Sequence, residues 1–156
     1  PPTFTAMLAE HLSRDTGWQA QEARNGDVLA PGRILVAPGD YHLLACREGK
    51  LLVASLNQGE KENFCRPAAD PMLRSLVGIS GVSVLAVVLT GMGHDGMAGC
   101  EAVVKSGGTV LAQDEETSVV WGMPGAVAQR GLCAALAPPE TLAEITGNLI
   151  KTGRLS

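Results

Sequence analysis

The sequence has few aromatic residues, no cluster of positive charge and no long hydrophobic run, and each deficiency excludes a class of protein. Aromatic side chains make up 3% of the 156 residues, so we expect a core of aliphatic side chains. The formal net charge is −4 and Lys and Arg are scattered, which argues against nucleic-acid binding. The longest apolar run, residues 82–89, is too short to span a bilayer, so no membrane insertion is expected.

The cysteines also exclude two kinds of site. Cys46, Cys65, Cys100 and Cys133 are widely spaced and form no Cys-x-x-Cys pair. This spacing indicates neither a zinc site nor a disulfide framework, so we expect reduced thiols, no metal ion and a cytoplasmic location. Hydrophobic residues make up 46% of the chain, and its length suits one compact domain.

The first half of the chain combines helical and strand patterns. Phe4, Met7, Leu8 and Leu12 are spaced as one face of a helix that begins at the first residues. Three short apolar segments follow and predict strands, of which the last two form a β-hairpin: 33–37, 42–47 and 51–56.

A second helix is predicted after a polar loop. Residues 57–67 are polar and are expected to form a surface loop. Asp70 followed by Pro71 predicts an N-cap with Pro at the first helical position. The helix is expected to end near Gly78 or Gly81.

The second half predicts a parallel sheet. Residues 82–89 are almost all apolar, which is typical of a strand buried on both faces. A glycine-rich turn, a helix over 97–106 and a strand over 109–112 complete a βαβ unit. Short helices are predicted over 115–121 and 124–129, and a last helix begins at Pro139. The predicted fold is α/β: a doubly wound, mainly parallel sheet flanked by helices, with an antiparallel hairpin.

The glycine-rich turn has two interpretations. Gly91, Gly93 and Gly96 fit the G-x-G-x-x-G fingerprint of dinucleotide sites, and Asp114 stands near the position of its acidic residue. In such sites, however, the helix N-terminus holds the pyrophosphate. Asp95 occupies that N-terminus here and its carboxylate would repel a phosphate, so a nucleotide-binding module remains only the alternative hypothesis.

Asp95 itself admits a structural and a catalytic interpretation. Asp is a favoured N-cap, and Asp95 could simply hold the first turn of the helix over 97–106. It also follows a central parallel strand, where α/β sheets place their sites. A carboxylate fixed there is suited to orienting a catalytic histidine.

Several motifs together resemble one family. Residues 89–96 (Leu-Thr-Gly-Met-Gly-His-Asp-Gly) and 112–124 resemble the signature of the CheB family, the protein-glutamate methylesterases of bacterial chemotaxis. Shorter matches follow the family's order along the chain: Pro31-Gly32-Arg33, Ala37-Pro38-Gly39-Asp40 with His42, and Arg66-Pro67 with Asp70. The family often has Tyr or Phe in place of Trp121, Arg in place of Gly125, and Ser-Val in place of Ala68-Ala69.

The resemblance implies an activity and a set of site residues. The family hydrolyses γ-glutamyl methyl esters on the cytoplasmic helices of chemoreceptors, deamidates receptor glutamines, and uses a Ser-His-Asp triad without a cofactor. Asp95 matches the triad aspartate, and Met92 and Gly93 match a loop whose backbone N–H groups could bind the oxyanion. His42 matches a recurrent family position that could be site-adjacent, but packing and capping a loop is the favoured interpretation. A response-regulator receiver domain normally shares the polypeptide.

Two elements of the family pattern are not found. The family's serine lies in a Gly-Ala-Ser-Thr-Gly-Gly turn and its histidine in a Gln-His-Met segment, and neither occurs in these residues. We therefore expect residues 1–156 to be a single, N-terminally incomplete catalytic domain that lacks the first strands of the fold and is inactive alone. The resulting open sheet edge or cleft is expected beside residues 91–95. A non-catalytic docking domain is the other alternative.

The remaining serine, histidine and cysteine side chains are expected to have structural roles. No serine lies in an elbow like that of the nucleophile in α/β hydrolases. His94 is expected to point away from Asp95, and His11 to be solvated. Cys100 is expected to be a small buried core residue.

The nucleotide alternative can be tested by calorimetry. NAD and ATP should give no saturable heat of binding, because Asp95 occupies the anion position at the helix N-terminus. Micromolar binding that becomes tighter in Asp95→Asn would contradict the methylesterase assignment and favour the nucleotide-binding module.

Overall fold

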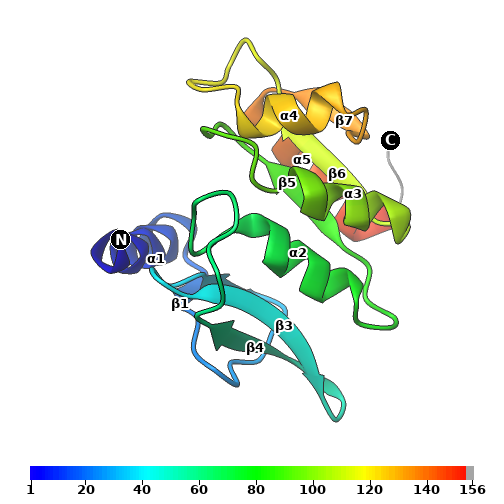
Figure 1. Cartoon of the computed structure of the whole chain (residues 1–156). Coiled ribbons are helices and arrows are strands. Elements are labelled where there is room, and N and C mark those ends of the chain that lie inside the picture. Colours follow the sequence, from blue (N-terminus) through cyan, green and yellow to red (C-terminus); the bar gives the residue numbers. More distant parts are fainter. Residues whose placement is uncertain (154–156) are drawn as a thin grey trace. The chain divides into compact units, whose positions relative to one another are not determined.

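The computed structural model describes residues 1–153, which Figure 1 shows as a ribbon. The chain divides into two compact units after Val82, and each is described by itself. The first unit contains α1 (Pro2–Thr16), β1 (Gln19–Glu22), β2 (Arg33–Val36), β3 (His42–Glu48), β4 (Leu51–Asn57) and α2 (Ala69–Val77). The second contains β5 (Leu85–Val88), α3 (Met97–Lys105), β6 (Thr109–Gln113), α4 (Met123–Gln129), β7 (Ala135–Ala137) and α5 (Pro139–Thr152).

The first unit is built on two pairs of strands. β3 and β4 form the predicted antiparallel hairpin, which turns at Gly49 with a positive φ of 59°. β1 and β2 form a parallel pair that begins with Gln19 beside Arg33. The sequence did not predict β1, because its Gln-Ala-Gln-Glu pattern has no apolar face. The core includes the buried side chains of Ala23, Leu43 and Ala54.

The predicted start of α2 is wrong by two residues. Ala68, in an extended conformation, is the N-cap, so Asp70 lies inside the first turn. The Asp70 side chain is 4% exposed, and its Oδ2 accepts a hydrogen bond of 2.9 Å from Asn63 Nδ2. Asp70 therefore ties the preceding loop to the helix. The predicted end at Gly78 is confirmed.

The second unit is a three-stranded parallel sheet with strand order β5-β6-β7. The central strand β6 is covered on both faces, since Val110, Leu111 and Ala112 are each at most 1% exposed. Figure 1 shows α3 and α5 on opposite sides of this sheet, as a doubly wound arrangement requires. The α/β class and the βαβ unit predicted from the sequence are confirmed.

β5 forms an edge of this sheet. Among residues 1–153 it pairs only with β6, so the predicted open edge is present. The prediction that both faces of this strand are buried is wrong. Ala86 and Val88 are buried, but Val87 on the other face is 41% exposed and Leu89 beyond the strand is 48% exposed.

The helix predicted over 115–121 is not formed. Asp114 Oδ1 accepts hydrogen bonds from the backbone N–H and the hydroxyl of Thr117, and the Ser118 hydroxyl donates to the Asp114 carbonyl. Such side-chain bonds satisfy the backbone in a turn and compete with helix formation. The segment is a loop between β6 and α4. β7, with three residues, was too short to be recognised by periodicity.

No helix in the part of the chain described, residues 1–153, has the length and hydrophobicity needed to cross a membrane.

Two glycines of the second unit allow a matched test of its packing. A Cβ at Gly108 would lie 2.6 Å from the Val84 carbonyl oxygen and 2.7 Å from Val103 Cγ1, whereas one at Gly147 in α5 would have no neighbour within 4 Å. Gly108→Ala should therefore lower the free energy of unfolding by about 1–3 kcal/mol. Gly147→Ala should raise it by about 0.5–1 kcal/mol. Urea unfolding measures both, and equal stabilities would contradict the close approach at Gly108.

Candidate active-site loops

Asp95 lies in the loop that joins the end of β5 to the start of α3. α3 begins at Met97, and its N-cap is Gly96, whose φ is 89°. Asp95 is half-buried and directly precedes this residue, so the N-cap position that the structural interpretation gave to Asp95 is held by Gly96. The loop follows the carboxyl end of a parallel strand, where α/β folds place their reacting groups.

The structure explains why glycine is needed at three positions of this loop, without a bound phosphate. Gly93 and Gly96 have φ values of 84° and 89°, in the left-handed region that side chains disfavour. A Cβ at Gly91 would lie 2.7 Å from Met123 Sδ. The G-x-G-x-x-G spacing is therefore accounted for by the turn itself.

The loop after β5 is hydrogen-bonded to the segment that precedes α4. Gly91 N–H donates to the Val120 carbonyl at 3.0 Å, and the Gly91 carbonyl accepts from Gly122 N–H at 3.1 Å and Met123 N–H at 2.9 Å. The Thr90 hydroxyl donates to the Val120 carbonyl at 3.1 Å and accepts from Val120 N–H at 2.9 Å. These bonds fix the start of the Asp95 loop to a neighbouring loop at the same edge of the sheet.

The contact between these segments requires small residues at two positions. A Cβ at Gly122 would lie 2.8 Å from the backbone nitrogen of Gly93 and 2.8 Å from the Gly91 carbonyl oxygen. A Cβ at Gly125 would lie 3.0 Å from ring atoms of Trp121. The Trp121 indole therefore packs against the bare backbone of Gly125, where a side chain would crowd the ring.

Met92 and Gly93 present their backbone at the surface of this loop. The Met92 side chain is 85% exposed. Within residues 1–153, neither the Met92 N–H nor the Gly93 N–H donates a hydrogen bond to another protein group. Both donors therefore lack a protein acceptor within these residues, and the Gly93 nitrogen lies against Gly122.

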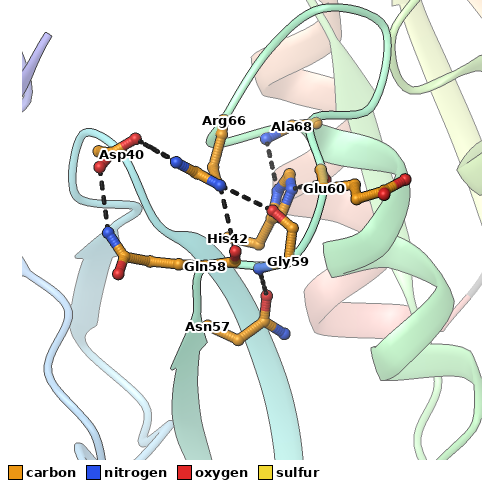
Figure 2. A network of polar contacts seen from close by, with 8 residues as sticks. All are labelled: Asp40, His42, Asn57, Gln58, Gly59, Glu60, Arg66 and Ala68. Atoms are coloured by element: carbon orange, nitrogen blue, oxygen red, sulfur yellow. Dashed lines mark hydrogen bonds and ion pairs between the residues drawn. The ribbon is translucent and has the colours of Figure 1, made fainter.

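His42 belongs to the first unit and is fully engaged there (Figure 2). It is 3% exposed; its Nδ1 accepts from Ala68 N–H at 3.2 Å, and its Nε2 lies 2.8 Å from the Glu60 carbonyl oxygen. Because Nδ1 accepts, the proton lies on Nε2, which donates to Glu60. His42 thus fastens the loop over 58–68 to β3, which fits the packing role that sequence reasoning also allowed.

The same loop is held by an ion pair. Arg66 Nη2 lies 2.6 Å from Asp40 Oδ1, and Arg66 Nη1 donates to the carbonyls of Gln58 and Gly59. Gln58 Nε2 donates to the other oxygen of Asp40 at 3.0 Å. The Arg66 hydrogen bond lowers the pKa of Asp40, with a smaller contribution from Gln58.

The remaining candidates form no second site. His11 and His94 are exposed, and Cys100 is completely buried, as predicted. Burial raises the pKa of the Cys133 thiol, which disfavours a reactive thiolate. Residues 1–153 contain no group of three or more His, Cys, Asp and Glu side chains that could hold a metal ion.

Comparison with known proteins identifies the fold and then the family. The chain is similar to the crystal structure of the Thermotoga maritima CheB methylesterase catalytic domain, with a TM-score of 0.86 and 39% identity over 92% of this chain and 78% of that one. A family model described as CheB methylesterase matches residues 1–146. The chain belongs to the CheB methylesterase family.

Two curated relatives agree with this assignment, and both are named protein-glutamate methylesterase/protein-glutamine glutaminase. The protein from Paramagnetospirillum magneticum is 56% identical over 88% of this chain, and that from Azospirillum brasilense is 55% identical over 88%. The chain covers 36% and 35% of their lengths, so it spans about a third of the relatives that it matches.

The ion pair predicts a pH dependence for the loop over 58–68. Because Arg66 holds the pKa of Asp40 below its ordinary value of 3.8, the pair stabilises the fold at neutral pH, and this contribution is lost as the pH falls through the lowered pKa. Arg66→Met should raise the pKa of Asp40, measured by NMR titration of its carboxyl carbon. Arg47→Met is the matched control, since Arg47 bonds to Ser80 instead. An unchanged Asp40 titration in Arg66→Met would contradict the assignment.

Proposed function

We propose that this chain is part of a protein-glutamate methylesterase and glutamine deamidase that acts on chemoreceptors, with Asp95 as the carboxylate of its triad. The observation that carries the proposal is the position of Asp95. It lies at the carboxyl end of β5, in a loop whose start is hydrogen-bonded to a neighbouring loop, in a chain of the CheB methylesterase family. The activity named for the relatives supplies the reaction.

The reaction requires a serine and a histidine besides Asp95. The serine oxygen attacks the side-chain ester carbonyl while the histidine takes the serine proton. The histidine then gives that proton to the departing methoxide, so methanol leaves and an acyl-enzyme remains. Water, activated by the same histidine, hydrolyses the acyl-enzyme and releases the glutamate carboxylate. With a glutamine substrate, the leaving group is ammonia.

Asp95 accepts the N–H of this histidine in the proposal. This bond keeps the other ring nitrogen directed at the serine and stabilises the imidazolium ion that forms. We assign neither the serine nor the histidine to these 156 residues, because no serine here lies in a nucleophile elbow and His42 is occupied by backbone bonds. The activity belongs to a protein that supplies both groups.

Met92 and Gly93 are proposed to stabilise the oxyanion. Their backbone N–H groups have no protein acceptor among the described residues and lie on the Asp95 loop. Preorganised backbone donors of this kind stabilise the charge that develops on the carbonyl oxygen. No metal or organic cofactor takes part in the proposed reaction.

The wider organisation is proposed by family likeness. Both compact units are assigned to one catalytic domain, because the family match runs through them from residue 1 to residue 146. The much greater length of the relatives leaves room for the receiver domain that the resemblance implied. The proposed substrates are the methylated cytoplasmic helices of chemoreceptors, which also gives the enzyme a cytoplasmic location.

The decisive variant is Asp95→Asn in the protein that carries the serine and histidine segments. We expect kcat for methanol release from methylated receptor membranes to fall by about 10⁴-fold, because an amide in place of the carboxylate favours the wrong histidine tautomer. Since Gly96 is the N-cap of α3, the substitution leaves the cap residue unchanged.

Asp15→Asn is the matched control. Asp15 is exposed at the end of α1 and pairs only with its neighbour Arg14 among the contacts described, so kcat should not change. Both variants are compared at equal thermal stability. If Asp95→Asn is as active as the control, Asp95 has no catalytic role and the site assignment fails.

A further inference from the structure

Gln113, the last residue of β6, is one of three polar or charged side chains that are buried within residues 1–153, the others being His42 and Asp70. It is 4% exposed, and both ends of its amide group are used. Oε1 accepts the Thr90 N–H at 2.8 Å, and Nε2 donates to the Thr117 carbonyl at 3.0 Å. Because one end must accept and the other must donate, an amide satisfies both partners at any pH, whereas a carboxyl could do so only when protonated.

The position of this amide explains why a polar side chain is buried here. The backbone ladder between β5 and β6 ends at the pair Val88 and Ala112. Thr90 lies beyond that ladder, and the Gln113 side chain supplies the acceptor that its N–H needs. The Gln113 carbonyl also accepts from Trp121 Nε1 at 3.1 Å. Gln113 therefore contacts the loop after β5 and the loop after β6 at the same time.

The Asp95 loop is fixed at its two ends. At its start, Thr90 is held by Gln113 and by Val120. At its end, the carbonyls of His94 and Gly96 accept hydrogen bonds from the first turn of α3. Gly91, the residue after Thr90, is bonded to Val120, Gly122 and Met123. The start of the Asp95 loop is therefore set by one network of hydrogen bonds, to which Gln113 contributes a buried side chain.

We propose that Gln113 is a positioning residue for Asp95, acting by anchoring Thr90 at the start of the loop through its side-chain amide. The inference rests on the proposed function and assigns no contact between Gln113 and the substrate. It predicts that exchanging the amide for a group with the wrong donor pattern lowers kcat, because small displacements of a catalytic group are costly to the rate.

The test uses two variants of the whole protein and one control. Gln113→Glu is isosteric but, when ionised, places an acceptor against the Thr117 carbonyl; when protonated, it can donate again. Gln113→Met keeps the length and removes both bonds. Gln129→Glu makes the same change of charge at the exposed end of α4 and should behave as wild type.

We expect Gln113→Glu at pH 8 to lower kcat by about tenfold to a hundredfold, with KM within about twofold of wild type. The ratio of its kcat to that of wild type should rise as the pH falls, because protonation restores the donor and burial raises the pKa of an introduced carboxyl. The ratio for Gln113→Met should stay low and independent of pH. The two loops contain five other titratable groups. They are the same in the variants and in wild type, so their titration cancels in the ratio: His94, Asp95, Asp114, Glu115 and Glu116.

Hydrogen exchange of the Thr90 amide provides a readout that needs no activity. It should be protected in wild type and lose protection in Gln113→Met by more than the change in global stability explains. The inference would be overturned if the ratio of kcat for Gln113→Glu to that of wild type did not change with pH, or if the Thr90 amide were equally protected in Gln113→Met.

If Asp95→Asn is inactive while Gln113→Glu keeps full activity, only the role of Gln113 fails. A wild-type protein without esterase activity would instead refute the proposed function, and the Thr90 amide would still report whether Gln113 anchors the loop.

Discussion

The attachment of the Thr90–Gly91 segment to the Val120–Met123 segment is the constraint on which the candidate site depends. Parallel strands bring the loops after β5 and β6 to one edge of the sheet, but the strand ladder ends before either loop begins. Reciprocal backbone bonds at Gly91 and the paired bonds of the Thr90 hydroxyl continue the connection past the ladder. This continuation anchors the start of the loop, as the proposed catalytic role of Asp95 requires.

The sequence predicted those elements whose own patterns are strong. α1, the β3–β4 hairpin and the βαβ unit around α3 follow from apolar periodicity and glycine stops, and the motif around Asp95 identified the family. Predictions failed where side chains replace the backbone as hydrogen-bond partners. The Asp114 carboxylate accepts hydrogen bonds from Thr117, which favours a turn over the helix predicted at 115–121. Asp70 is buried and bonded to Asn63 instead of capping α2. Neither pairing is visible in a local pattern.

The roles of His42 and Gln113 could not be derived from sequence for a related reason. Each is a buried polar residue with backbone partners in a segment distant along the chain, and backbone groups leave no signature in the sequence. A single sequence shows only that a polar residue stands next to an apolar strand. Gln113 satisfies a donor just outside a strand ladder and His42 satisfies the N–H of a helix N-cap, and both are places where a fold leaves backbone groups without a partner. Buried polar residues at strand ends are therefore the positions to inspect first in such folds.

The same reasoning explains how a loop can imitate a nucleotide-binding fingerprint. The glycines at 91, 93 and 96 arise from one close contact and two left-handed backbone conformations. A phosphate-binding loop needs glycine for similar reasons, namely a tight turn and a close approach of the backbone. The spacing of glycines therefore reports the geometry of a strand–turn–helix connection and does not identify its ligand. The carboxylate of Asp95, which directly precedes the N-cap Gly96, bears on the kind of ligand, because a fixed carboxylate near a helix N-terminus disfavours an anion and suits a cationic or hydrogen-bond-donating partner.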